Sequence, residues 1–176
     1  MVSKETKEEN NSLILLNNIS NVIEKIAIYC CVSLIAILLV IVLAQITLRW
    51  IGFSIPWTEE LSRFLMIWAG LLGASVALKR GSHIGVELVV NMFPAKIKYV
   101  FSLVIKLIVI IFIIYFIKYG WDVAVKALRV RSPGLEILMF WPKLSLPVGG
   151  IIMLIQAVCL FLIEIFTGSK EKESSA

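Results

Sequence analysis

Three charged residues at the start of one apolar stretch are the first candidates for chemistry in this sequence. Glu59 and Glu60 precede Arg63 by four and three residues, the spacing at which side chains meet on one side of a helix. Such a group could belong to an ion path across a membrane, or it could be neutralised internally and act as a structural lock or a subunit contact. We favour the structural role, because the dipole of a helix stabilises carboxylates in its first turn.

Lys106 is the best candidate for an ionisable group inside a membrane, about seven residues into another apolar stretch. Ionisable residues at such depth often mark a pathway or a site. A lysine can instead lay its methylene stem along apolar surface and bring its ammonium group to the interface, and Lys96 and Lys98 predict a basic interface nearby. We expect this interfacial, lipid-facing position for Lys106; pairing with a partner subunit or a lipid headgroup is the alternative.

The sequence lacks the residue sets that metal, haem or nucleophilic chemistry requires. His83 is the only histidine, which excludes a bis-histidine haem site, and the sequence has no Cys/His spacing typical of a zinc site. The three cysteines, Cys30, Cys31 and Cys159, lie in apolar stretches without Cys-x-x-Cys spacing. We therefore predict no enzyme activity and no cofactor, and we interpret His83 as an interfacial polar residue.

The composition indicates an integral membrane protein. Of the 176 residues, 60% are hydrophobic and 16% are charged, and the mean hydropathy is +0.95, whereas soluble domains contain roughly 45–50% apolar and 25% charged residues. The formal net charge of +5 does not indicate nucleic-acid binding, because most basic residues flank apolar stretches, where they act as orientation signals.

Four apolar stretches are long enough to cross the hydrocarbon as helices. They are residues 26–48, 58–78, 99–121 and 144–166. The predicted fold class is an all-α integral membrane protein with four transmembrane helices plus short interfacial amphipathic helices.

Small and polar residues inside these stretches predict contacts between the helices. Ala69, Gly73 and Ala77 recur every four residues and would form a smooth helix-packing face. Gln45 and Gln156 are expected to hydrogen-bond from one helix to another.

The segments outside the spans carry their own expectations. Residues 1–25 lack the apolar core and cleavage site of a signal peptide, so we expect them to be retained and to lie partly on the membrane surface. Residues 83–93 are amphipathic but too short to span, which predicts an interfacial helix. The third helix can continue past Gly120 through Arg129, because no glycine or proline intervenes. Residues 167–176 are expected to be disordered.

The distribution of basic residues predicts the orientation. Four spans bring both termini to one side, which would carry nine of these residues against seven near the other. The nine are Lys4, Lys7, Lys25, Lys79, Arg80, Lys96, Lys98, Lys170 and Lys172, and the seven are Arg49, Arg63, Lys118, Lys126, Arg129, Arg131 and Lys143. The excess favours cytoplasmic termini.

Several motifs give the chain a resemblance to a known family. They are Trp57-Thr58-Glu59-Glu60-Leu61-Ser62-Arg63 and Gly81-Ser82-His83-Ile84-Gly85-Val86-Glu87, followed by Gly120-Trp121, Ser132-Pro133 and Pro147-Val148-Gly149. In this order they resemble the small membrane subunit, of the DctQ type, of TRAP (tripartite ATP-independent periplasmic) transporters, and within that family the sialic-acid systems.

The resemblance implies a multi-pass protein of the bacterial inner membrane that forms a heterodimer with a large permease subunit and works with a periplasmic substrate-binding protein. In such systems the large subunit is thought to hold the sodium and substrate sites and to move as an elevator, while the small subunit braces the fixed scaffold. The expected function is therefore a scaffold in sodium-coupled uptake of an organic acid, foremost sialic acid. Membrane lipids are further expected partners.

The same resemblance suggests where the binding protein would dock. Arg49, Trp50, Trp57, Arg129 and Arg131 border the connections on the side opposite the termini. We expect them to form a periplasmic docking surface, and we assign no substrate-binding residue to this chain.

Two functions of other classes remain open. An independent four-span exporter would need a functional carboxylate at mid-membrane, and the deepest acid is Glu164, near the end of a span. A membrane anchor of a quinone- or haem-linked redox complex is disfavoured by the single histidine.

Overall fold

The computed structural model of the chain consists of long helices joined by short connections. It describes residues 2–53, 55–90 and 95–173, with side chains for residues 14–53, 55–81 and 100–165. The elements are α1 (Val2–Trp50), α2 (Pro56–Val90), α3 (Ala95–Lys126), the 3-10 helix η1 (Ala127–Arg129), α4 (Phe140–Lys143) and α5 (Ser145–Glu173). Within the described part, four helical stretches are long and apolar enough to cross a membrane, which confirms the predicted fold class: Ile14–Trp50, Pro56–Gly81, Val100–Arg129 and Phe140–Ile165.

Helix α1 runs without interruption from Val2 to Trp50, where the sequence analysis expected a separate segment over residues 1–25. The physical reason is that the chain has no glycine or proline before Gly52. Gly52 ends the helix with a φ of 85°, and the amides of Gly52 and Phe53 donate to the carbonyls of Arg49 and Leu48 at 3.1 and 3.0 Å. This is the glycine cap in which a left-handed residue satisfies the last carbonyls of a helix.

Two further segments continue helices that were expected to end. Helix α2 extends to Val90, so residues 83–90 do not start the separate helix expected over residues 83–93; the rest of that range lies outside the described residues. Gly81 costs a helix only about 1 kcal/mol relative to alanine and does not break it. Helix α5 likewise extends to Glu173, where disorder was expected from residue 167, because lysine and glutamate are good helix formers.

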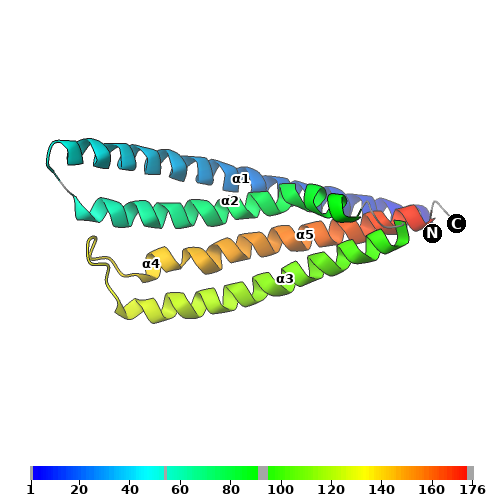
Figure 1. Cartoon of the computed structure of the whole chain (residues 1–176). Coiled ribbons are helices and arrows are strands. Elements are labelled where there is room, and N and C mark those ends of the chain that lie inside the picture. Colours follow the sequence, from blue (N-terminus) through cyan, green and yellow to red (C-terminus); the bar gives the residue numbers. More distant parts are fainter. Residues whose placement is uncertain (1, 54, 91–94, 174–176) are drawn as a thin grey trace.

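The four long helices lie side by side in the order α1, α2, α5, α3 (Figure 1). Among the described residues, α2 and α5 each contact the other three long helices, whereas no contact joins α1 to α3. In the most apolar part of Phe140–Ile165, which includes most of α5, 39% of the residues are buried inside the structure. In the most apolar part of Ile14–Trp50, in α1, the share is 6%. Both termini lie at the end where the helices converge (Figure 1). Helices α2 and α5 are therefore the inner helices, with α5 the more buried of the two, and α1 and α3 form the edges.

Glycines allow α5 to approach its neighbours closely. A Cβ atom on Gly149 would lie 2.8 Å from the Cβ of Leu71 in α2, and one on Gly150 would lie 2.6 Å from Cγ1 of Ile117 in α3. Small residues permit such close approach in membrane proteins, where dispersion forces and interhelical hydrogen bonds drive helix association.

Candidate functional site

Glu60 joins the start of α2 to the turn that follows α3. Its Oε2 atom accepts hydrogen bonds from the backbone amides of Gly134 and Leu135, both at 3.1 Å, and from the hydroxyl of Ser132. A Cβ on residue 134 would lie 3.0 Å from that oxygen and 3.2 Å from Cα of Trp57, so only glycine fits here without displacement. Two of the motifs quoted above, around Glu60 and around Ser132, therefore meet in space.

The predicted group of three charges is divided in the structure. Arg63 pairs with Glu59 at 3.7 Å, and the two side chains are 68% and 55% exposed; Gln45 of α1 also donates to Glu59 at 3.5 Å. Adjacent residues in a helix point about 100° apart, so Glu60 turns away from this pair and toward the α3–α4 turn. An exposed pair of this kind contributes little stability, which leaves Glu60 as the structural member of the group.

The turn that Glu60 holds is closed by its own backbone. The amide of Ser132 donates to the carbonyl of Ile137 at 2.8 Å, and the amide of Met139 donates to that of Val130 at 2.9 Å. Glu136 adopts a positive φ of 55° within this turn. The carboxylate of Glu60 thus anchors a compact, hydrogen-bonded structure.

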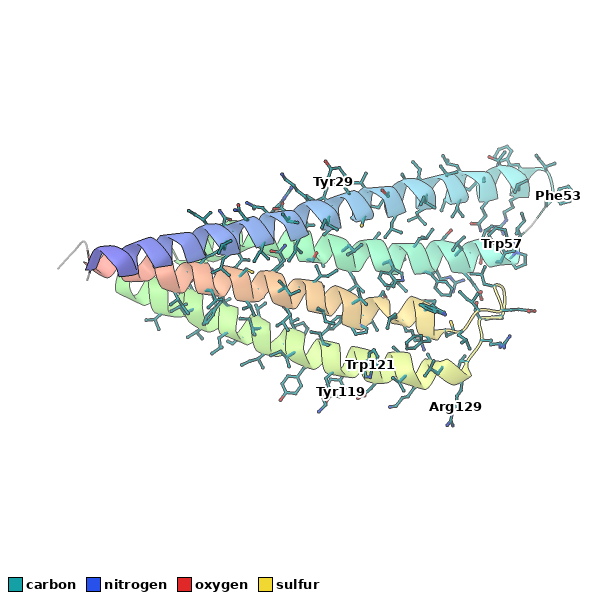
Figure 2. The ribbon with its side chains drawn as sticks, turned by 180° about the vertical axis from the view of Figure 1, so that it is seen from behind. Tyr29, Phe53, Trp57, Tyr119, Trp121 and Arg129 are labelled. Carbon is teal, nitrogen blue, oxygen red and sulfur yellow. The ribbon has the colours of Figure 1, made fainter. Side chains whose placement is uncertain are left out.

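The residues of the predicted docking surface gather at the end of the molecule opposite the termini. Five exposed residues form this surface: Arg49, Trp50, Trp57, Arg129 and Arg131. The exposed fraction of Trp50 is 89%. Figure 2 shows Trp57, at the start of α2, and Arg129, beyond the end of α3, at this end of the molecule. The arrangement offers cations and indole rings to a partner; its use for docking stays a prediction.

A second charged group lies near the other end of the α1–α2 pair, and the sequence analysis missed it. Glu24 of α1 contacts Lys79 at 2.9 Å and Arg80 at 2.8 Å, and Asn21 accepts a further hydrogen bond from Lys79 at 2.7 Å. The residues of this group lie 56 and 58 positions apart in the sequence, and the antiparallel packing of α1 and α2 brings them together. This group fixes the register of the two helices.

Lys106 was expected to face lipid at the interface, and the structure differs. Its ammonium group forms an ion pair with Glu164 of α5, and its side chain is only 15% exposed. Because α3 and α5 pack together, the carboxylate takes over the stabilisation that headgroups or water would otherwise supply. The side chains of His83, Lys96 and Lys98, the other members of this expected group, lie outside the described residues.

A cavity of about 300 Å³ lies beside this ion pair, between α2, α3 and α5. Its lining is apolar apart from Lys106 and includes Ala77 and Gly81. Since Glu164 already neutralises Lys106, the cavity offers a charged solute little to bind.

The remaining small and polar candidates take part in contacts between helices. Gln156 and Ser20 are each 1% exposed; the Ser20 hydroxyl donates to the Gln156 side-chain oxygen at 2.7 Å, and the Gln156 amide donates to the Ser20 carbonyl at 3.1 Å. The thiol of Cys31 donates to the carbonyl of Ala69 at 3.4 Å, and Gly73 faces the same sulfur.

Ala77, the third residue of the predicted helix-packing face, is exposed and lines the cavity. In the part of the chain whose side chains are described, no three metal-ligating residues come together.

Comparison with known proteins gives these features a family context. Residues 38–168 match the family described as "Tripartite ATP-independent periplasmic transporters, DctQ component". The sialic acid TRAP transporter small permease protein SiaQ of Vibrio cholerae is 33% identical over 141 residues, which cover 79% of this chain and 77% of that protein.

Two other relatives are named for different solutes, and one of them is a much longer protein than this chain. The sialic acid TRAP transporter permease protein SiaT of Haemophilus influenzae is 29% identical over 133 residues, 73% of this chain but 21% of that longer protein. The C4-dicarboxylate TRAP transporter small permease protein DctQ of Vibrio cholerae is 31% identical over 80 residues, 45% of this chain and 34% of that protein.

Proposed function

The chain belongs to the family of DctQ components of tripartite ATP-independent periplasmic transporters, and from this membership we propose that it is the small subunit that braces a large permease subunit. It is a multi-pass membrane protein of a bacterial transport system and not an enzyme. Its contribution to uptake would be to hold the fixed part of the transporter in place.

The pairing of polar groups inside the bundle is the observation that carries this proposal. Ser20 bonds to Gln156, and Lys106 pairs with Glu164, so these groups already have partners within the chain. A site for an organic anion would need convergent donors that are still available. The pairing of Glu164 also argues against the independent exporter, which would need a carboxylate free to take part in transport.

The relatives support a large membrane partner. In SiaT, the region similar to this chain makes up 21% of one longer polypeptide that is named a permease. We infer that this chain forms the equivalent heterodimer with a separate large subunit. That partner would carry out the elevator movement that exposes the substrate site to each side of the membrane in turn. It would also couple transport to sodium.

The transported solute is proposed to be an organic acid, with sialic acid the first choice. SiaQ is named for sialic acid, and the DctQ relative is named for C4-dicarboxylates; both solutes are carboxylic acids. A periplasmic binding protein would deliver the solute at the end that carries Trp50, Trp57 and Arg129, with both termini in the cytoplasm and lipids around the bundle.

Reconstituted uptake tests the proposal. Proteoliposomes that contain this chain, the large subunit and the binding protein should accumulate labelled sialic acid when a sodium gradient is applied. Omission of this chain should abolish uptake, and this chain alone should give none. Sodium-driven uptake by this chain alone, or full uptake in its absence, would contradict the scaffold role.

A further inference from the structure

The outward face of α3 carries a polar stripe composed of Tyr115, Lys118, Tyr119 and Asp122. These residues are spaced by three and four positions, so they share one side of the helix. All four are exposed, and the tyrosines are 55% and 62% exposed. Figure 2 shows Tyr119 directed away from the other helices. The tyrosine rings stack on one another with their centroids 6.4 Å apart.

Lys118 lies near the middle of the membrane-crossing part of α3. Toward the termini, Lys106 lines the same cavity as Gly81, which follows the Lys79–Arg80 pair of α2. At the other end, the helical segment closes at Arg129. With a rise of 1.5 Å per residue, Lys118 is about 18 Å from Lys106 and roughly 16 Å from Arg129. Since the hydrocarbon core is about 30 Å thick, the lysine is far from both interfaces.

The structure places no ion-pair partner beside either charge of the stripe within the residues whose side chains it describes. Among the residues with described side chains, Lys118 and Asp122 have no ion-pair partner, whereas Arg63, Lys79, Arg80 and Lys106 each have a carboxylate. An exposed charge at mid-membrane is costly, and such residues usually face protein or a water-filled cavity.

The outward face of α1 is a useful contrast, because its surface suits lipid. Leu39, Val40 and Leu43 are exposed there. The hydroxyls of Ser33 and Thr47 are satisfied within the helix, since Ser33 donates to the carbonyl of Tyr29 and Thr47 to that of Leu43, both at 2.8 Å. The outward face of α1 is therefore suited to lipid, whereas the outward face of α3 exposes two charges that lipid chains cannot neutralise.

We propose that the polar stripe of α3 is the surface on which the large permease subunit packs, and that this partner presents a carboxylate to Lys118 near the middle of the membrane. The proposal rests on the scaffold function above and adds the face that the scaffold uses. A lipid headgroup lies at the interface, too far along the membrane normal to neutralise Lys118, and an acyl chain carries no charge. In SiaT the region similar to this chain is part of one longer permease polypeptide. This favours a large subunit, and not a second copy of this chain, as the partner that packs on the stripe.

Site-specific photo-crosslinking in the complex of this chain with its large subunit tests the face. A photoreactive phenylalanine analogue is placed at Tyr115 or Tyr119, and the control positions are Val40 and Leu43 of α1. The α3 positions should crosslink to the large subunit and the α1 positions to lipid. Products that join Tyr119 only to lipid or to a second copy, or a large-subunit product from Val40 alone, would overturn the proposal.

Charge reversal tests the partner's carboxylate. Lys118→Glu should reduce the amount of large subunit that co-purifies by at least about tenfold, because like charges across an interface are strongly unfavourable. Lys118→Arg should retain it. Lys25→Glu, at an exposed position of α1, is the control and should also retain it. The level of each variant in the membrane is measured in parallel, and equal recovery with Lys118→Glu at normal level would refute the charge pairing.

The outcomes separate this inference from the proposed function. If the unmodified chain co-purifies with the large subunit but only α1 crosslinks to it, the scaffold role stands and the α3 face is wrong. If the unmodified chain never binds the large subunit, the proposed function itself fails.

Discussion

Replacement of Gly149 by alanine should weaken the packing of α5 against α2, and Gly70→Ala is the matched control. The added Cβ on residue 149 would lie 2.8 Å from the Cβ of Leu71, whereas carbon atoms in contact prefer about 3.5–4.0 Å. A Cβ is fixed to the backbone, so no change of rotamer relieves this overlap. The helices would have to separate by roughly 0.7–1.2 Å.

The magnitude follows from a comparison of the two variants. Alanine in place of glycine within a helix gains about 0.5–1 kcal/mol, and at Gly70 nothing lies within 4 Å of the new atom. At Gly149 the same gain is opposed by an overpacking penalty of about 1–3 kcal/mol. The gain cancels in the comparison, so the two free energies of unfolding should differ by about 1–3 kcal/mol.

Thermal unfolding of the purified chain in detergent measures this difference. For a chain of this size 1 kcal/mol corresponds to roughly 2–4 °C in Tm, and Gly149→Ala should unfold at the lower temperature. Equal Tm values for Gly149→Ala and Gly70→Ala would refute the close approach of α5 to α2.

Three further predictions concern the polar contacts. A double-mutant cycle with Ser20→Ala and Gln156→Leu should give a coupling energy of about 0.6–1.7 kcal/mol in the free energy of unfolding; strictly additive effects would show that the two side chains do not interact. Lys106→Glu and Glu164→Lys should each lower the yield of folded protein because each places two like charges together, and the double reversal should restore it; a double variant as poor as either single one would count against the ion pair. Glu60→Ala should speed hydrogen exchange at the amides of the turn it binds, measured by mass spectrometry, and unchanged protection there would mean that the carboxylate does not anchor the turn.

The fold was largely predictable because hydrocarbon imposes a simple rule on sequence. A crossing helix needs about 20 apolar residues, and four such stretches are visible in this chain. The lengths of the helices were less predictable, since α1 and α5 do not end where polar residues begin, and α5 continues through Gly168 to Glu173. Gly52 stops α1, whereas the polar residues before Ile14 do not interrupt it.

The site was predictable where the contact is local and unpredictable where it is distant. The Glu59–Arg63 pair follows from a spacing of four in a helix, but the partners of Glu60 lie 72 to 75 residues away, and Gln156 bonds to Ser20 at a separation of 136 residues. Periodicity shows which face of a helix is polar and does not show which helix stands opposite.

Lys118 illustrates the same limit for depth in the membrane. The sequence analysis counted it with the residues near the far interface, although its side chain lies midway between Lys106 and Arg129 on a continuous helix. The continuation of this helix through Arg129, which the sequence predicted and which α3 and η1 follow, places Lys118 farther from the end of the helical segment than an end at residue 121 would. The polar stripe would lie next to a connecting loop if the helix ended at residue 121. On the longer helix it is a candidate contact surface.

The mass of the native complex tests the central claim most directly. The tagged chain is purified from membranes that also contain the large subunit, and the mass of the assembly is measured with the protein intact. The account predicts one copy of this chain bound to one much larger permease subunit. Recovery of this chain only as a monomer, or only in assemblies with copies of itself, would contradict it.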